Sequence, residues 1–164
     1  MTDFLMLLQR DHRDLLSGLD ELLQATCVAQ IRTALDGVRL GLTAHAEAED
    51  IVLYGALIKA GAPDLLDELV GQARAAHLAQ EGALASLVCA APGTATWRTR
   101  AIKLRDLVHE HAGYEERTVR PAIRELAPTV YDSLAGLFAT ERLRQLAMLQ
   151  PSAPIVVTEL ARAC

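Results

Sequence analysis

The sequence predicts an all-α protein, an antiparallel up-down four-helix bundle with an additional C-terminal helical segment. Of its 164 residues, 51% are apolar and 4% are aromatic. A leucine- and alanine-rich mixture of this kind favours helices packed on helices, and the chain is long enough to bury a sizeable core. Apolar residues also recur at spacings of three and four along most of the chain. This spacing is typical of amphipathic helices.

The first two helices are predicted on either side of Cys27. Thr2 or Asp3 is expected to cap a helix that ends near Ala25. Its apolar stripe is Leu5, Leu8, His12, Leu15, Leu19 and Leu22. The second helix is expected at about 29–60, where Gly61 ends it. Its stripe is Val38, Leu42, His45, Glu49, Val52 and Ala56.

The third and fourth helices are separated by a break at residues 92–94. Proline is tolerated in the first turn of a helix, so the third helix is expected from Pro63 to about Ala90. Its stripe is Leu66, Val70, Ala73, His77, Glu81, Leu84 and Val88. The fourth helix is expected to begin near Trp97 and to be kinked or ended by Pro121. Its stripe is Trp97, Ala101, Leu104, Val108, His111, Glu115, Thr118 and Ala122.

A further helix is predicted after Pro128, at about 129–149. Its apolar positions are Val130, Leu134, Leu137 and Leu146. One or two last helical turns are expected within 155–163. The predicted organisation is therefore one unit at 1–150, the four-helix bundle plus the following helix, and a C-terminal tail at 151–164.

Charge and hydropathy exclude several classes of partner. The net charge is −5 and the basic residues are scattered, which argues against a nucleic-acid or anionic membrane surface. No apolar run approaches the roughly 18 residues of a membrane span. The N-terminus lacks the basic start and the cleavage site of a signal peptide. A cytoplasmic protein is therefore expected.

The three cysteines, Cys27, Cys89 and Cys164, are widely spaced and form no Cys-x-x-Cys pair. Such a set indicates neither a disulfide framework nor a thiolate zinc site. We expect reduced thiols without a role in the site.

Four of the five histidines lie each in the apolar stripe of a different predicted helix, and three of these stripes carry an acid one turn later. In an up-down bundle with short loops, residues at equal depth on consecutive helices lie equally far from the intervening turn. The pairs His45–Glu49 and His77–Glu81 are equally distant from Pro63, and the other loops agree less tightly. The sequence therefore predicts one polar layer: His12, His45, Glu49, His77, Glu81, His111 and Glu115.

A lone histidine in an apolar stripe is more often a hydrogen-bonded core residue than a metal ligand. A whole layer of histidines and acids is a different case, because burying several ionisable groups costs roughly several kcal/mol of free energy for each group unless something compensates their charge. A bound cation does so. Imidazoles and carboxylates without thiolates favour iron over manganese or zinc, and this number of ligands suits two metal ions joined by bridging carboxylates.

The motifs of this layer resemble those of the hemerythrin family, in its bacterial hemerythrin-like, HHE cation-binding form. They are Asp11-His12, His45-x-x-x-Glu49-Asp50-x-x-Leu53-Tyr54, His77, and His111-x-x-x-Glu115-Glu116-x-x-x-x-Pro121. Each is weak alone, but four in this order are fairly specific. The resemblance spans about 5–121 and extends through the helix after Pro128. It implies an antiparallel four-helix bundle that holds two non-haem iron ions with an oxo or hydroxo bridge.

Carried over by position, the resemblance makes the four histidines terminal ligands and Glu49 a bridging carboxylate. The second bridge lies five residues after the last histidine in the oxygen carriers, which is Glu116 here, and four after it in many hemerythrin-like proteins, which is Glu115. Four residues advance about 400° along a helix, or about 40° from His111, whereas five advance to about 140°. Helical phase therefore favours Glu115.

The chain departs from the oxygen carriers at Glu81, where they have a second histidine, and we expect Glu81 to be a metal ligand. A more anionic ligand set stabilises oxidised iron, so we expect oxidative or peroxide chemistry in place of oxygen transport. Gly55 also replaces a proline that often ends the second motif. Tyr54 or Tyr114 could lie next to the metal ligands, with packing or an interface as the default role of both. His109 points away from His111 and is expected to be exposed.

Three functional hypotheses follow. The first is a di-iron oxidoreductase that acts on peroxide or dioxygen. The second is a protein that binds or senses dioxygen, nitric oxide or iron without turnover, which would need a protein partner. The third is a metal-free helical interaction module. Metal content separates the third from the others, and turnover separates the first from the second.

Overall fold

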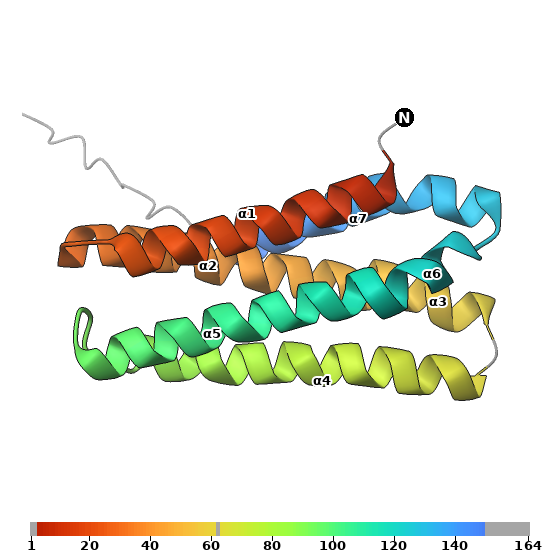
Figure 1. Ribbon diagram of the computed structural model, residues 1–164. Helices are drawn as coiled ribbons and strands as arrows, with labels where there is room; N and C mark the ends of the chain where they lie inside the picture. The colour runs from red at the N-terminus through yellow and green to blue at the C-terminus, as the bar shows by residue number, and fades with distance from the viewer. Residues whose placement is uncertain (1–2, 62, 150–164) are drawn as a thin grey trace, which may run out of the picture.

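The computed structural model describes residues 3–61 and 63–149, and every regular element in this part of the chain is helical. The long helices lie lengthwise beside one another (Figure 1). The predicted all-helical class is thus confirmed. The turns expected within 155–163, the tail at 151–164 and Cys164 lie outside the described residues, as does the side chain of Leu66.

Side-chain caps define where two of the long helices begin. The Asp3 carboxylate accepts a hydrogen bond of 3.2 Å from the Met6 N–H at the start of α1 (Phe4–Gln24). The Thr94 hydroxyl accepts one of 3.2 Å from the Trp97 N–H at the start of α5 (Ala95–Tyr114). Gly93, just before this cap, has a φ of 79°, a conformation that favours glycine. These local signals place both helix starts close to the predicted ones.

The second and fourth predicted helices each contain one π turn. The segments are α2 (Val28–Ala48), η1 (Glu49–Leu53) and α3 (Tyr54–Ala60) in the first case, and α5, η2 (Glu115–Val119) and α6 (Arg120–Arg124) in the second. In each π turn the carbonyl of the leading glutamate, Glu49 or Glu115, accepts a hydrogen bond from the backbone N–H five residues later. A π turn inserts one residue into the helical repeat.

The extra residue shifts the buried positions that follow each π turn by one. The sequence predicted Val52, Ala56, Thr118 and Ala122 on the inner stripes. The buried residues are instead Leu53, Leu57, Val119 and Ile123, each less than 3% exposed. The uninterrupted 3.6-residue period was therefore wrong beyond each glutamate. The same shift turns Tyr54 inward, where it is completely buried.

The inner face of α4 (Pro63–Val88) follows a tighter repeat than the sequence suggested. Most of its buried positions alternate by three and four, namely Val70, Ala73, His77, Gln80, Leu84 and Leu87, with Leu69 and Ala83 buried beside them. This 3.5-residue repeat is that of a coiled-coil seam. Gln80 and Leu87 thus occupy the inner positions predicted for Glu81 and Val88.

The last helix, α7 (Pro128–Leu149), packs against α2 and α1. Its buried residues are Leu134, Phe138 and Gln145, whereas Leu137, predicted on the inner stripe, is exposed. In Figure 1 this helix lies behind α1. The added helix α7 therefore covers part of α2, η1 and α1.

The apolar core is divided into two clusters. One contains Phe4, Leu8 and Leu53, and the other contains Leu15 and Trp97. The buried histidines of α1, α2 and α4 lie between them: on α1, for example, His12 comes between Leu8 and Leu15. The fold thus holds one polar layer with an apolar cluster on each side.

Two further expectations concern the cysteines and membrane crossing. Cys27 and Cys89 are free and exposed. Within residues 3–61 and 63–149, no helix combines the length and apolar character that crossing a membrane requires.

Candidate metal centre

Six of the seven predicted ligands meet in the polar layer. They come from α1, α2, α4, α5 and the two π turns: His12, His45, Glu49, His77, His111 and Glu115. All six are buried, and Glu49 is completely so. Ligand atoms of four of them, His12, His45, Glu49 and His111, lie within 4.8 Å of one another.

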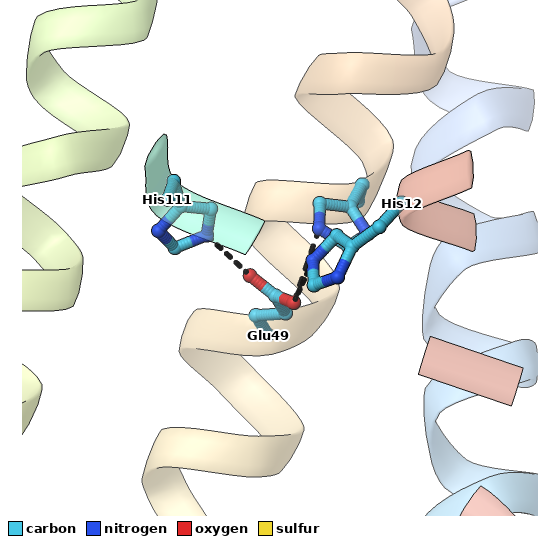
Figure 2. A group of neighbouring side chains, drawn as sticks. His12, Glu49 and His111 are labelled. Atoms are coloured by element: carbon cyan, nitrogen blue, oxygen red, sulfur yellow. Dashed lines mark hydrogen bonds and ion pairs between the residues drawn. The ribbon is translucent and has the colours of Figure 1, made fainter. Parts of the chain in front are cut away.

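Glu49 lies between two pairs of histidines. Its Oε1 atom is 3.0 Å from His45 Nε2 and 3.6 Å from His12 Nε2. Its Oε2 atom is 3.0 Å from His77 Nε2 and 3.4 Å from His111 Nε2. Figure 2 shows the carboxylate between His12 and His111, with one oxygen toward each side. Each oxygen therefore faces one pair of imidazoles.

Glu115 supplies a second carboxylate to the same layer. Its Oε2 atom is 3.1 Å from His12 Nε2 and 4.0 Å from His111 Nε2. Its Oε1 atom accepts a hydrogen bond from the buried Tyr54 hydroxyl. Glu116 is exposed and contacts the Gln9 amide at 3.4 Å. The structure thus brings Glu115, and not Glu116, to the histidines.

Several buried atoms of this layer lack a hydrogen-bond partner among the described residues. They include both ring nitrogens of His12, Nε2 of His45, Oε1 of Glu49 and Oε2 of Glu115. His45 Nε2 and Glu49 Oε1 are close, but their angles are not those of a hydrogen bond. Buried polar atoms without partners are unfavourable, and a cation among them would satisfy them. The residues present therefore fit a metal ion.

The histidines and carboxylates shift one another's pKa values. Burial lowers the pKa of His12, but Glu115 and Glu49 outweigh it and raise the pKa to about 10. Burial likewise lowers the pKa of His77, whereas Asp50 and Glu49 raise it to about 9. Burial raises the pKa of Glu49, yet the neighbouring histidines, His45 foremost, hold it well below its ordinary value. Without a metal, imidazolium ions thus balance the carboxylates, and a cation must displace their protons.

Asp11 and Asp50 contact the outer ring nitrogens of two histidines. His45 Nδ1 lies 2.8 Å from Asp11 Oδ2 and donates to that buried carboxylate. His77 Nδ1 lies 3.6 Å from Asp50 Oδ1. Carboxylates in this position orient metal-ligating imidazoles. Asp11 was not among the predicted ligands and had no predicted role, although its place in the Asp11-His12 motif was a usable signal.

The two tyrosines near the motifs differ in role. The Tyr54 hydroxyl reaches Glu115, so Tyr54 does more than pack. The Tyr114 hydroxyl donates to the Leu69 carbonyl at 3.2 Å, away from the histidines. His109 is exposed, as expected.

Glu81 is the predicted ligand that the structure does not bring to the layer. It is exposed, and no hydrogen bond or ion pair joins it to the six clustered residues in the described part of the chain. The reason is the 3.5-residue seam of α4, which places Gln80 inward after His77. The expectation of a more anionic ligand set through Glu81 thus loses its basis. Glu81 instead lines a cleft of about 320 Å³ between α2 and α4, which His77 and Asp50 also line.

Comparison with known proteins identifies one family. The family model described as Hemerythrin HHE cation binding domain matches residues 3–123, about three quarters of the chain. All six clustered side chains lie within the matched residues. No match was found among curated proteins or among solved structures.

Proposed function

Since the chain belongs to the hemerythrin family, we propose that it holds two non-haem iron ions in its polar layer and reacts there with dioxygen or peroxide. The family and the buried histidine and glutamate cluster indicate metal binding. The number of ions, the oxo or hydroxo bridge that the resemblance implies, and the reaction belong to the proposal.

One observation carries the proposal: the two oxygens of Glu49 face different histidine pairs. Oε1 faces His12 and His45, and Oε2 faces His77 and His111. Two imidazoles and one carboxylate oxygen, with positions left open, are typical of non-haem iron sites that handle dioxygen. The chain contains two such sets of two imidazoles and one carboxylate oxygen, and both sets use Glu49. This arrangement favours two ions over one. Glu115, close to one histidine of each pair, would be the second carboxylate between them.

The layout of the helices supports the same proposal. We assign the ion-holding unit to an antiparallel four-helix bundle of α1, α2 with α3, α4, and α5 with α6. The course of the chain in Figure 1, where successive long helices follow one another in alternating directions, supports this assignment. With α7 added, we propose that this unit is the one predicted at 1–150, of which the structure describes 3–61 and 63–149.

Open coordination positions and an open cleft support a small ligand. Four imidazoles and two carboxylates provide fewer donors than two six-coordinate ions accept. The cleft of about 320 Å³ that His77 lines is the route that we propose for dioxygen, peroxide or nitric oxide. Bound iron supplies the one-electron steps that such ligands require. Tyr54 holds Glu115 through its hydroxyl, and the apolar clusters exclude water above and below.

Peroxide decomposition offers the simplest test, because two hydrogen peroxide molecules yield two waters and one dioxygen without an external electron donor. Dissolved oxygen is followed after peroxide is added to the iron-loaded chain. We expect steady oxygen release that is lost in His77→Ala and retained in His109→Ala, the control at an exposed histidine. An iron-loaded chain that releases no oxygen contradicts peroxide decomposition.

The same sample tests reversible ligand binding. If oxygen release is absent, a reversible change of the optical spectrum on adding and removing dioxygen or nitric oxide would assign a binding or sensing role. If the chain takes up no iron, the metal-free helical interaction module is the hypothesis that remains.

A further inference from the structure

The last helix, α7, begins beyond the residues that the family model matches, yet it contacts a histidine of the polar layer. The ring of Phe138, completely buried, lies edge-on to the ring of His45 with centroids 6.1 Å apart. One turn later, Arg142 Nη2 donates to Asp11 Oδ1 at 2.8 Å. The other oxygen of Asp11 accepts from His45 Nδ1, also at 2.8 Å. Two residues of α7 thus support His45.

The relay Arg142–Asp11–His45 determines which ring nitrogen of His45 faces the layer. With its Nδ1–H held by Asp11, the ring presents Nε2 toward Glu49. A metal-ligating histidine needs this arrangement, in which a carboxylate fixes the tautomer and the plane of the ring. Asp11 is 7% exposed, and a carboxylate so buried needs a charged partner to stay in place. Arg142 is that partner.

Among the four histidines, His45 is the one held most closely. The outer nitrogens of His12 and His111 have no hydrogen-bond partner in the described part of the chain, and that of His77 is 3.6 Å from Asp50. We infer that Arg142 is a positioning residue for the metal centre, which acts through Asp11 to set the affinity of the ion facing His12 and His45. This inference rests on the proposed function.

The neighbouring Arg144 provides a matched control. It lies on the same helix, is more exposed than Arg142, and pairs with Glu141 at 2.9 Å. A change that acts only through the charge or helix content of α7 would affect both arginines alike. A change that acts through the relay affects Arg142 alone.

The test is an anaerobic titration of the metal-free full chain with ferrous iron against a competing chelator. In Arg142→Met we expect the affinity for one of the two ions to fall about 10- to 100-fold, while the other ion is bound as in the wild type. Arg142→Lys keeps the charge and should restore most of the affinity, and Arg144→Met should behave as the wild type. If Arg142→Met fails to fold, Arg142→Gln takes its place with the same expected loss.

A second readout needs no metal. In the metal-free chain with ¹⁵N-labelled histidine, the Nδ1–H signal of His45 should shift in Arg142→Met and stay unchanged in Arg144→Met. A purely structural role for Arg142 would lower the melting temperature without moving the two ion affinities apart.

The outcomes separate the inference from the proposed function. A wild type that binds two ions, with Arg142→Met binding both equally well, overturns the inference and leaves the function standing. A wild type that binds no iron overturns the proposed function and the inference together.

Discussion

Removing the Tyr54 hydroxyl tests how the polar layer is held. Tyr54→Phe keeps a completely buried ring in its apolar cluster, so no cavity forms. The change removes the hydroxyl that donates to Glu115 Oε1. Burial, together with the charges of Glu49 and Glu115, raises the pKa of Tyr54, so the phenol remains a donor throughout the usual pH range. A hydrogen bond to a charged group contributes about 1.5–3 kcal/mol. The free energy of unfolding should fall by that amount.

Urea denaturation of the metal-free protein at pH 7 measures this loss. At about 2–4 °C per kcal/mol for a chain of this size, the melting temperature should fall by about 3–12 °C. Tyr114→Phe is the control, because that hydroxyl donates to a neutral carbonyl from a half-buried ring, and its removal should cost about 0.5–1.5 kcal/mol. A loss in Tyr54→Phe no larger than in Tyr114→Phe would refute the assigned contact.

Three further predictions concern pH and ligand identity. In the metal-free chain the pKa values of His12 and His77 are raised from 6.5 to about 10 and about 9. The stabilisation that the two protonated histidines contribute is therefore fully present below pH 6.5 and is lost as the pH rises through 9 to 10. Equal free energies of unfolding at pH 6.5 and pH 10 in urea denaturation would contradict this. Glu81→Gln should leave iron affinity within about twofold of the wild type. Losses of about 10- to 100-fold are expected only from residues that hold a ligand in place, and no hydrogen bond or ion pair joins the exposed Glu81 to a clustered side chain in the described residues. Glu115→Gln should lower iron affinity at least about 100-fold and Glu116→Gln should not, and the reverse result in a chelator competition would reassign the second carboxylate.

Periodicity predicted most of the helices and the polar layer because both depend on local patterns. Every residue of the predicted stripes of α1 and of the first part of α5 is buried, and only Phe4, Asp11 and Ala112 are buried beside them on these helices. The equal distances of the pairs His45–Glu49 and His77–Glu81 from the turn near Pro63 predicted that they lie at one depth. In the structure His45 and His77 each lie 3.0 Å from Glu49, at different oxygens of its carboxylate. Histidines within the apolar stripes of four different helices were therefore enough to predict the polar layer.

The misplaced residues arise from deviations in helical repeat. A π turn after Glu49 and another after Glu115 rotate the residues that follow, and no single residue type announces such a turn. Glu81 was misplaced because an i+4 step and the i+3 step of a coiled-coil seam are both compatible with a helix, and packing against neighbours chooses between them. Arg142 is far from the motifs in sequence, so its contact with Asp11 required the tertiary structure.

The central claim is that one buried carboxylate lies between two iron ions. The direct measurement is iron per chain, by elemental analysis of protein purified from iron-supplemented cells, for the wild type, His12→Ala and Glu49→Gln. Because Glu49 faces both histidine pairs and His12 belongs to one, we expect about two ions in the wild type, about one in His12→Ala and fewer than about 0.3 in Glu49→Gln. A wild type with fewer than about 0.3 iron ions per chain would contradict metal binding. A Glu49→Gln protein that retains two would contradict the shared carboxylate.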